Sequence, residues 1–187
     1  MGDSTSSSDA RSLREALVGL NSAEQQKIAY QWALAHDKLI DLLGDFANER
    51  KLLIFRSGSE CENWIDPVLN LVYKMNTLIH VGGNIAVLFE RIDQYNQLFP
   101  STALRFVGFQ AMSSQNVYPI FVQTFVPNAR FATGDEIREY MSTIHFLPKD
   151  DDGVFENDNY IISDIKPKNV LYLDGDIFVI DAEIRKK

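Results

Sequence analysis

The sequence predicts an α+β domain in which mostly antiparallel strands are interrupted by a few helices. Short β-like runs recur along the chain, and helices are inserted among them without the regular strand–helix alternation of a doubly wound sheet. Near the end of the chain, Asp174-Gly175 separates two apolar runs, and Asp-Gly in this position is typical of a tight antiparallel hairpin. These two observations together favour an antiparallel sheet with added helices.

The overall composition indicates an ordinary globular domain and excludes several functions. The chain has 187 residues, of which 45% are hydrophobic and 24% charged, enough to bury a sizeable core. The net charge of −8 argues against nucleic acid as a partner, because binding a phosphate backbone needs a concentrated basic surface. No apolar run is long enough to span a bilayer, and the polar N-terminus does not resemble a secretory signal. The single cysteine, Cys61, fits a reducing compartment, so we expect a cytoplasmic protein with no membrane partner.

Two segments precede the predicted sheet. Residues 1–20 begin with a Ser-rich polar stretch, and we expect a disordered lead-in there. Residues 21–50 are predicted to be a helical segment whose helix continues to Gly44. The apolar stripe of this helix is expected to pack on the following domain, with binding to a separate partner as the alternative. The helix begins at one of two capping boxes, which are Asn21 with Glu24 and Ser22 with Gln25.

The predicted sheet lies within residues 51–126. A turn-rich stretch around Gly58 follows the first strand, and a helix that includes Glu90 is predicted from about residue 84 until Pro100 ends it. The β-like runs are residues 51–55, 68–75, 103–113 and 117–126.

The last segment, residues 127–187, combines one helix with the hairpin. Thr133 and Glu136 have capping-box spacing at the start of the helix, and an acidic connector then leads to residues 160–184. With Asp174-Gly175 as a two-residue turn, Leu173 faces Asp176, and counting back along both strands places Asn169 opposite Ile180.

Polar side chains gather at the open end of this hairpin. Asn169 and Asp181 lie there, close enough to share one ion, and an amide oxygen with a carboxylate is a common way to hold Mg²⁺. Asp164 and Lys166 come just before the first strand. A carboxylate there can accept a hydroxyl proton, and an ammonium can neutralise charge on a transferring phosphoryl group. The pattern therefore indicates phosphate and metal chemistry, and the alternative is that Asp164 and Asp181 are structural or solvated carboxylates and Asn169 a loop amide.

The stretch SDIKPKNVLYLDGDIFVIDAE, residues 163–183, resembles the catalytic loop of protein kinases followed by their metal-binding aspartate. This resemblance implies that Asp164 is the catalytic base and that Lys166 contacts the γ-phosphate of ATP. It also implies that Asn169 and Asp181 are the ligands of Mg²⁺.

Upstream elements resemble the nucleotide-binding part of a kinase in the expected order. VYKM resembles the strand that ends in the nucleotide-binding lysine, here Lys74, and Glu90 on the next helix is its candidate partner. RSGSECENW stands where kinases have the glycine-rich loop, which implies cofactor-binding roles for Gly58 and Ser59. The alternatives are that Lys74 is an ordinary strand lysine and Glu90 a solvated helix residue.

The chain also contains the motifs SGSECENW, QLFP, VYPIFVQTFVPNARFAT, DEIREYM and NDNYIISDIKPKNVLYLDGDIFVIDAEI. With these motifs the sequence is more similar still to the serine/threonine/tyrosine kinase-like domains found in polyvalent proteins of bacterial mobile elements. The resemblance implies a reduced kinase-like fold, with an antiparallel five-stranded N-lobe carrying one helix over residues 51–126. A minimal, truncated C-lobe of a helix and the β-hairpin would follow over residues 127–187.

Several departures from typical kinases leave two functions open. Ile162 and Ser163 replace the usual His and Arg, Ala182 and Glu183 replace the Phe and Gly after the metal aspartate, and no helical platform for protein substrates follows. The first hypothesis is an ATP- and Mg²⁺-dependent phosphotransferase acting on an unknown hydroxyl-bearing substrate. The alternative is a non-catalytic, pseudokinase-like module that binds nucleotide or a protein partner.

Overall fold

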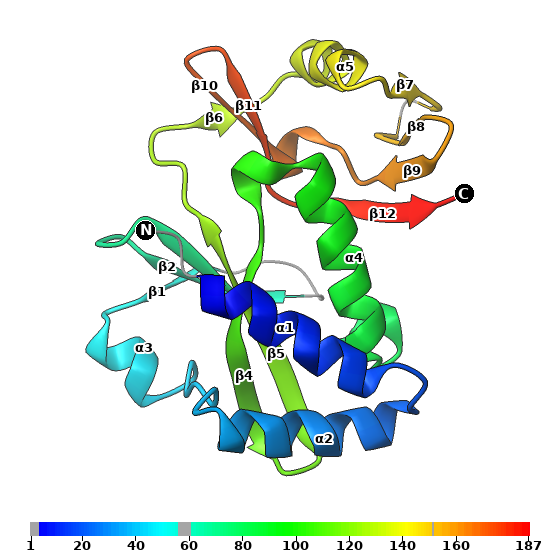
Figure 1. Cartoon of the computed structure of the whole chain (residues 1–187). Helices are drawn as coiled ribbons and strands as arrows, with labels where there is room; N and C mark the ends of the chain where they lie inside the picture. The colour runs from blue at the N-terminus through cyan, green and yellow to red at the C-terminus, as the bar shows by residue number, and fades with distance from the viewer. Residues whose placement is uncertain (1–3, 56–60, 151) are drawn as a thin grey trace. The chain divides into compact units, whose positions relative to one another are not determined.

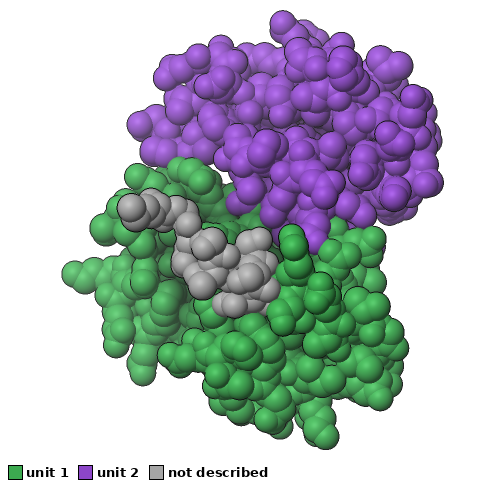
Figure 2. Space-filling view, viewed as in Figure 1, with its two compact units in different colours: residues 1–90, 104–125 green, residues 91–103, 126–187 purple. Residues whose placement is uncertain are grey.

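The structure, a computed structural model, describes residues 4–55, 61–150 and 152–187. The chain forms two compact units, of which unit 1 comprises residues 1–90 and 104–125 and unit 2 comprises residues 91–103 and 126–187 (Figure 2). Helices and antiparallel strands occur together, so the predicted α+β class is confirmed. None of the helices in the described part of the chain has the length and apolar character needed to cross a membrane.

Unit 1 is built on a five-stranded antiparallel sheet, as the resemblance implies, and the strand order is β1-β2-β3-β5-β4 (Figure 1). One strand, β2, was predicted as part of a turn-rich stretch instead. The sequence of β2 lacks the alternation of hydrophobic residues that predicts a strand, because two of its buried residues, Asn63 and Asp66, are polar. The strands are β1 (Leu53–Phe55), β2 (Cys61–Asp66), β3 (Leu71–Asn76), β4 (Arg105–Ser113) and β5 (Asn116–Thr124).

The two faces of this sheet are covered by different parts of the chain. On one face, Trp64 and Tyr73 pack with Leu42 and with residues of the short helix α3 (Asp45–Glu49). On the other face, the rings of Phe106 and Phe121 contact Phe89 of α4 (Ile85–Leu98). Because successive strand residues point to opposite faces, each residue of β2 and β3 can be assigned to one of these two environments.

A helix covers most of the segment, residues 1–20, in which a disordered lead-in was expected. Helix α1 spans Ser4–Leu17, and Leu13 and Leu17 are fully buried. These two residues are four apart and therefore lie on one side of the helix, which packs on α2 and β4. These two apolar residues follow a Ser-rich stretch and are too few to predict a helix from the sequence.

Helix α2 (Ser22–Ala35) begins as predicted but ends earlier than the predicted Gly44. The capping box is the Asn21–Glu24 pair, because Asn21 Oδ1 accepts from the Glu24 backbone N–H at 3.0 Å and Glu24 returns a bond to the Asn21 N–H. After α2, the segment 38–40 extends along β4, where Ile40 N–H donates to Phe109 O and Phe109 N–H donates to Lys38 O, both at 2.8 Å. Pairing with the sheet edge replaces the last turns of the predicted helix.

Unit 2 contains more strands than the predicted helix and hairpin. Helix α5 (Gly134–Thr143) has the predicted Thr133–Glu136 capping box. One sheet has the order β11-β10-β6, and a second has the order β12-β9-β8-β7. In the second sheet β9 and β12 lie side by side and antiparallel, with Ser163 opposite Glu183 (Figure 1). The strands are β6 (Arg130–Phe131), β7 (Leu147–Pro148), β8 (Phe155–Glu156), β9 (Tyr160–Ser163), β10 (Val170–Leu173), β11 (Asp176–Val179) and β12 (Glu183–Lys186), and the 3₁₀ turns of the chain are η1 (Ile79–Val81), η2 (Pro100–Thr102) and η3 (Pro167–Asn169).

The close approach of the 38–40 segment to β4 can be tested at Gly108. A Cβ atom there would overlap the Lys38 carbonyl oxygen and come within 3.0 Å of Ile40 Cδ1. Gly108→Ala is therefore expected to lower the free energy of unfolding by about 1–3 kcal/mol, measured by thermal unfolding. Gly134→Ala is the control, because the nearest atom to its added Cβ is 3.7 Å away. Equal losses in the two variants would contradict this packing.

Candidate functional site

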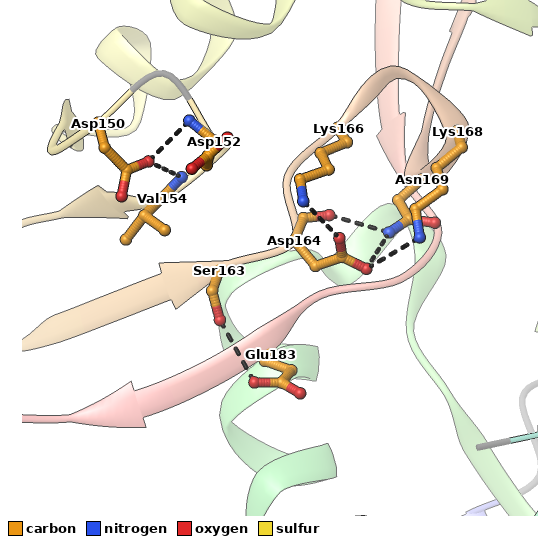
Figure 3. A network of polar contacts seen from close by, with 9 residues as sticks. All are labelled: Asp150, Asp152, Val154, Ser163, Asp164, Lys166, Lys168, Asn169 and Glu183. Atoms are coloured by element: carbon orange, nitrogen blue, oxygen red, sulfur yellow. Dashed lines mark hydrogen bonds and ion pairs between the residues drawn. The ribbon is translucent and has the colours of Figure 1, made fainter. Parts of the chain in front are cut away.

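The candidate catalytic residues gather around the carboxylate of Asp164, in the loop between β9 and β10 (Figure 3). Asp164 Oδ1 lies 3.6 Å from Lys166 Nζ, and Oδ2 lies 3.5 Å from Lys168 Nζ. Oδ2 also accepts a hydrogen bond from Asn169 Nδ2 at 2.7 Å. The Asp164 side chain is 36% exposed, so these ion pairs are partly screened by solvent and orient the carboxylate more than they stabilise the fold.

The backbone at Asp164 adopts a left-handed conformation with φ of 61°. Asp is among the few residues that tolerate this region, because its short polar side chain can hydrogen-bond locally. The turn that results allows Lys166 N–H to donate to Asp164 O at 3.0 Å and brings Asn169 back to the same residue. The sharp turn is thus what places Asp164, Lys166 and Asn169 together.

Asn169 is buried, and its amide orientation is fixed by two bonds to one residue. Its Nδ2 donates to the Asp164 carbonyl oxygen at 2.9 Å and to the Asp164 carboxylate at 2.7 Å. These bonds use both hydrogens of the amide nitrogen. No residue in the described part of the chain donates to Asn169 Oδ1, so this oxygen stays available as a hard ligand for a cation.

The hairpin that follows has the predicted register. Leu173 pairs with Asp176, and Ile180 N–H donates to Asn169 O at 2.9 Å, so Asn169 lies opposite Ile180 as expected. Both turn residues have positive φ, 52° at Asp174 and 98° at Gly175, which agrees with a type I′ turn. Asp181, whose side chain is exposed, comes next after Ile180 at the open end of the hairpin. A shared ion between Asn169 and Asp181 stays a prediction.

Two buried hydroxyl groups hold the end of β11. Tyr95 Oη and Thr102 Oγ1 each donate to Val179 O at 2.5 Å. The Ile180–Asn169 bond makes Val170 and Val179 a pair without mutual hydrogen bonds, so the Val179 carbonyl points away from β10 and needs other donors. The backbone two residues before Asp181 is thereby fixed.

Strand β10 is supported on its other side by β6. The Arg130 guanidinium lies 4.0 Å from the ring centre of Tyr172 and forms a bidentate pair with Glu136. The hydrogen bond from Arg130 is the main reason that the pKa of Glu136 falls to about 2, and bonds from Thr133 contribute. This arrangement connects the start of α5 to β10, the strand that begins directly after Asn169.

The acidic connector also supports the loop. Asp150 Oδ1 accepts from the backbone N–H groups of Asp152 and Val154, at 2.9 and 3.2 Å, and Ile165 N–H donates to Gly153 O at 3.0 Å. Gly153 has φ of 82°, and a Cβ there would lie 2.6 Å from the Ile165 carbonyl oxygen. Only glycine fits this approach, so the connector packs directly against the residue between Asp164 and Lys166.

The other predicted site residues belong to unit 1. Lys74 is half-buried in β3, where it lies opposite Phe121 and therefore on the sheet face that α4 covers. Glu90 is exposed on α4, and its pairing with Lys74 stays a prediction. Gly58 and Ser59 lie outside the described residues. Within the described ranges, no group of three or more His, Cys, Asp or Glu side chains could hold a metal ion.

Sequence reasoning missed three residues that the structure adds to the site: Lys168, Tyr95 and Thr102. Lys168 follows the Pro of the loop and was not assigned a role, although its spacing of four from Asp164 is one at which opposite charges often meet. Tyr95 lies within the helix predicted from about residue 84 and was not assigned a role. A buried Tyr hydroxyl usually has a hydrogen-bond partner, and this was the available signal.

Removing both hydroxyl groups on Val179 should destabilise unit 2. In the double variant Tyr95→Phe, Thr102→Val the buried Val179 carbonyl loses its two donors, which is expected to cost about 1–3 kcal/mol in urea denaturation. Each single variant should cost less, because one donor remains. Tyr118→Phe is the control, since that hydroxyl makes an exposed contact with Asn116 Nδ2 at 3.3 Å. A double variant as stable as this control would refute the assignment.

Comparison with known proteins identifies the family. A family model described as a serine/threonine/tyrosine kinase found in polyvalent proteins matches residues 22–187. The match therefore includes α2, which the sequence resemblance had left out, and every later element. No curated protein and no solved structure gave a match. Because the family match covers most of the chain, the protein belongs to the family of serine/threonine/tyrosine kinases found in polyvalent proteins.

Proposed function

We propose that this protein is an ATP- and Mg²⁺-dependent phosphotransferase that transfers the γ-phosphoryl group of ATP to a hydroxyl group. The observation that carries the proposal is the cluster of Asp164, Lys166 and Asn169 around one carboxylate in a single loop. In this proposal unit 1 contains the N-lobe of a reduced kinase-like fold, and unit 2 contains its reduced C-lobe. We further propose a bacterial, cytoplasmic protein that belongs to a mobile element.

The loop provides groups suited to the attacking and transferring ends of the reaction. The Asp164 carboxylate, partly exposed and held by Asn169, would accept the proton of the substrate hydroxyl. The Lys166 ammonium, on the other carboxylate oxygen, would neutralise charge that develops on the transferring group. Phosphoryl transfer needs little beyond positioning and charge stabilisation, which a fixed loop provides.

The chemistry of the donor set fits Mg²⁺. Asn169 Oδ1 and the Asp181 carboxylate are hard oxygen ligands, and Mg²⁺ in phosphotransferases is held by one or two side chains together with substrate phosphates and water. Bound Mg²⁺ would supply positive charge that neutralises the phosphates. The residues of this chain would determine the position of the ion. The Asp164 carboxylate accepts a hydrogen bond from the Asn169 amide, and the Asn169 carbonyl oxygen accepts one from the Ile180 N–H, next to Asp181.

One observation supports a second candidate, a non-catalytic module that binds nucleotide or a protein partner. Each oxygen of the Asp164 carboxylate already contacts an ammonium group, from Lys166 or Lys168. A substrate hydroxyl would have to share or displace these contacts. The cluster would then serve to hold phosphate rather than to accept a proton.

Nucleotide binding can be tested by thermal shift. Mg-ATP at about a hundredfold excess over its Kd should stabilise the protein by about 2.7 kcal/mol, a rise in Tm of about 5–10 °C. Lys74→Ala should abolish most of this rise, whereas Lys27→Ala, at an exposed position of α2, should keep it. If millimolar Mg-ATP leaves the Tm unchanged, both candidate functions that involve nucleotide are wrong.

Catalysis can be tested by transfer of radiolabel from γ-labelled ATP to the protein itself and to Ser-, Thr- and Tyr-containing peptides. Asp164→Asn is expected to abolish transfer, because an amide cannot accept the proton. Asp174→Asn is a matched control, since Asp174 also has positive φ and lies in the hairpin turn, away from the cluster. Mg-ATP binding without any transfer would leave only the binding module.

A further inference from the structure

Asn63, in strand β2, is a buried polar residue whose side-chain oxygen has no hydrogen-bond partner among the described residues. The residue is only 9% exposed, and its Oδ1 is the one fully buried side-chain polar atom in the described residues that has no hydrogen-bond partner. Leaving a buried acceptor unpaired opposes folding, because its bonds to water are lost and nothing replaces them. Such a residue requires an explanation.

Other buried amides of unit 1 show what an internal partner looks like. Gln110 Oε1 accepts from Leu43 N–H at 3.2 Å, and its Nε2 donates to Ala111 O at 3.1 Å. The amide of Gln25 likewise bonds at both ends, to Leu20 O and Ala86 N–H. These amides connect parts of the fold, whereas the Asn63 amide connects none of the described residues.

The position of Asn63 points to a ligand. Asn63 lies directly opposite Lys74 in the β2–β3 ladder, so the two side chains are on the same face of the sheet. The neighbouring pair, Trp64 and Tyr73, belongs to the core on the other face. Lys74 lies opposite Phe121, whose ring packs on α4. An amide whose oxygen has no partner among the described residues therefore lies beside Lys74, the lysine proposed to contact the nucleotide.

We propose that Asn63 is a ligand-contact residue whose side-chain amide donates a hydrogen bond to the phosphate chain of the nucleotide beside Lys74. This inference rests on the proposed nucleotide binding. Since no described residue donates to the Asn63 oxygen, the amide can turn its N–H group toward the ligand without breaking a bond at that oxygen. A bond from an amide N–H to a charged phosphate oxygen is stronger than one between neutral groups. An ammonium has three N–H donors, so Lys74 can serve the phosphate and the Asn63 oxygen at once.

The free protein gives the first test. Asn63→Leu replaces the amide by an apolar group of similar shape and should raise the Tm of the full chain by about 2–4 °C. Gln110→Met, the matched control, removes an amide that has internal partners and should lower the Tm. A lower Tm for Asn63→Leu would show that the amide has a structural hydrogen bond, and this would overturn the inference.

Calorimetric titration with Mg-ATP gives the second test. Asn63→Leu should bind about tenfold more weakly or worse, while Gln110→Met should bind like the wild type. Asn63→Asp should bind more weakly still, because a carboxylate has no N–H donor and repels phosphate. Equal or tighter binding by Asn63→Asp would overturn the assignment to phosphate, since it would mean that the ligand offers a donor or a cation.

The outcomes also separate this inference from the proposed function. If the wild type binds Mg-ATP and Asn63→Leu binds it equally well, the role of Asn63 is wrong and nucleotide binding stands. If the wild type does not bind Mg-ATP, both are wrong.

Discussion

The hydrogen bond from Ile180 N–H to Asn169 O determines much of the candidate site in unit 2. It fixes the register at which β10 and β11 separate, so that Asp181 follows immediately on the strand opposite Asn169. It also turns the Val179 carbonyl away from β10, toward the hydroxyls of Tyr95 and Thr102. A slip of one residue in β11 would move the side chains of that strand to the other face and change which residue follows opposite Asn169.

The parts of the fold that the sequence predicted correctly are those specified by local chemistry. A two-residue Asp-Gly turn permits one register, so the pairing of Leu173 with Asp176 could be counted from the turn. The capping boxes at Asn21 and Thr133 likewise depend on residues only three apart. Lys166 and Asn169 follow Asp164 in the same loop, and the sharp turn at Asp164 brings both side chains to its carboxylate.

The parts that escaped prediction depend on contacts distant in sequence. Helix α2 ends before Gly44 because the 38–40 segment pairs with Phe109 in β4, far along the chain. Strand β2 has buried polar residues, and Asp66 among them is satisfied by the N–H groups of Val68 and Leu69 in the following turn. The hydroxyls of Tyr95 and Thr102 both donate to the Val179 carbonyl oxygen in β11, which is far along the chain. No local pattern carries this information.

The pairing of β9 with β12 has a consequence for how the site could be regulated. Ser163 faces Glu183 at one end of the loop, and Asn169 is bonded to Ile180 at the other, so the segments bearing Asp164 and Asp181 form a ring of backbone closed by hydrogen bonds on both sides. A segment closed in this way cannot swing outward without opening one of its two ladders. A movement of the backbone after Asp181 that switched the site on and off would break hydrogen bonds between paired strands. Regulation of the site would therefore act through the ligand that binds there.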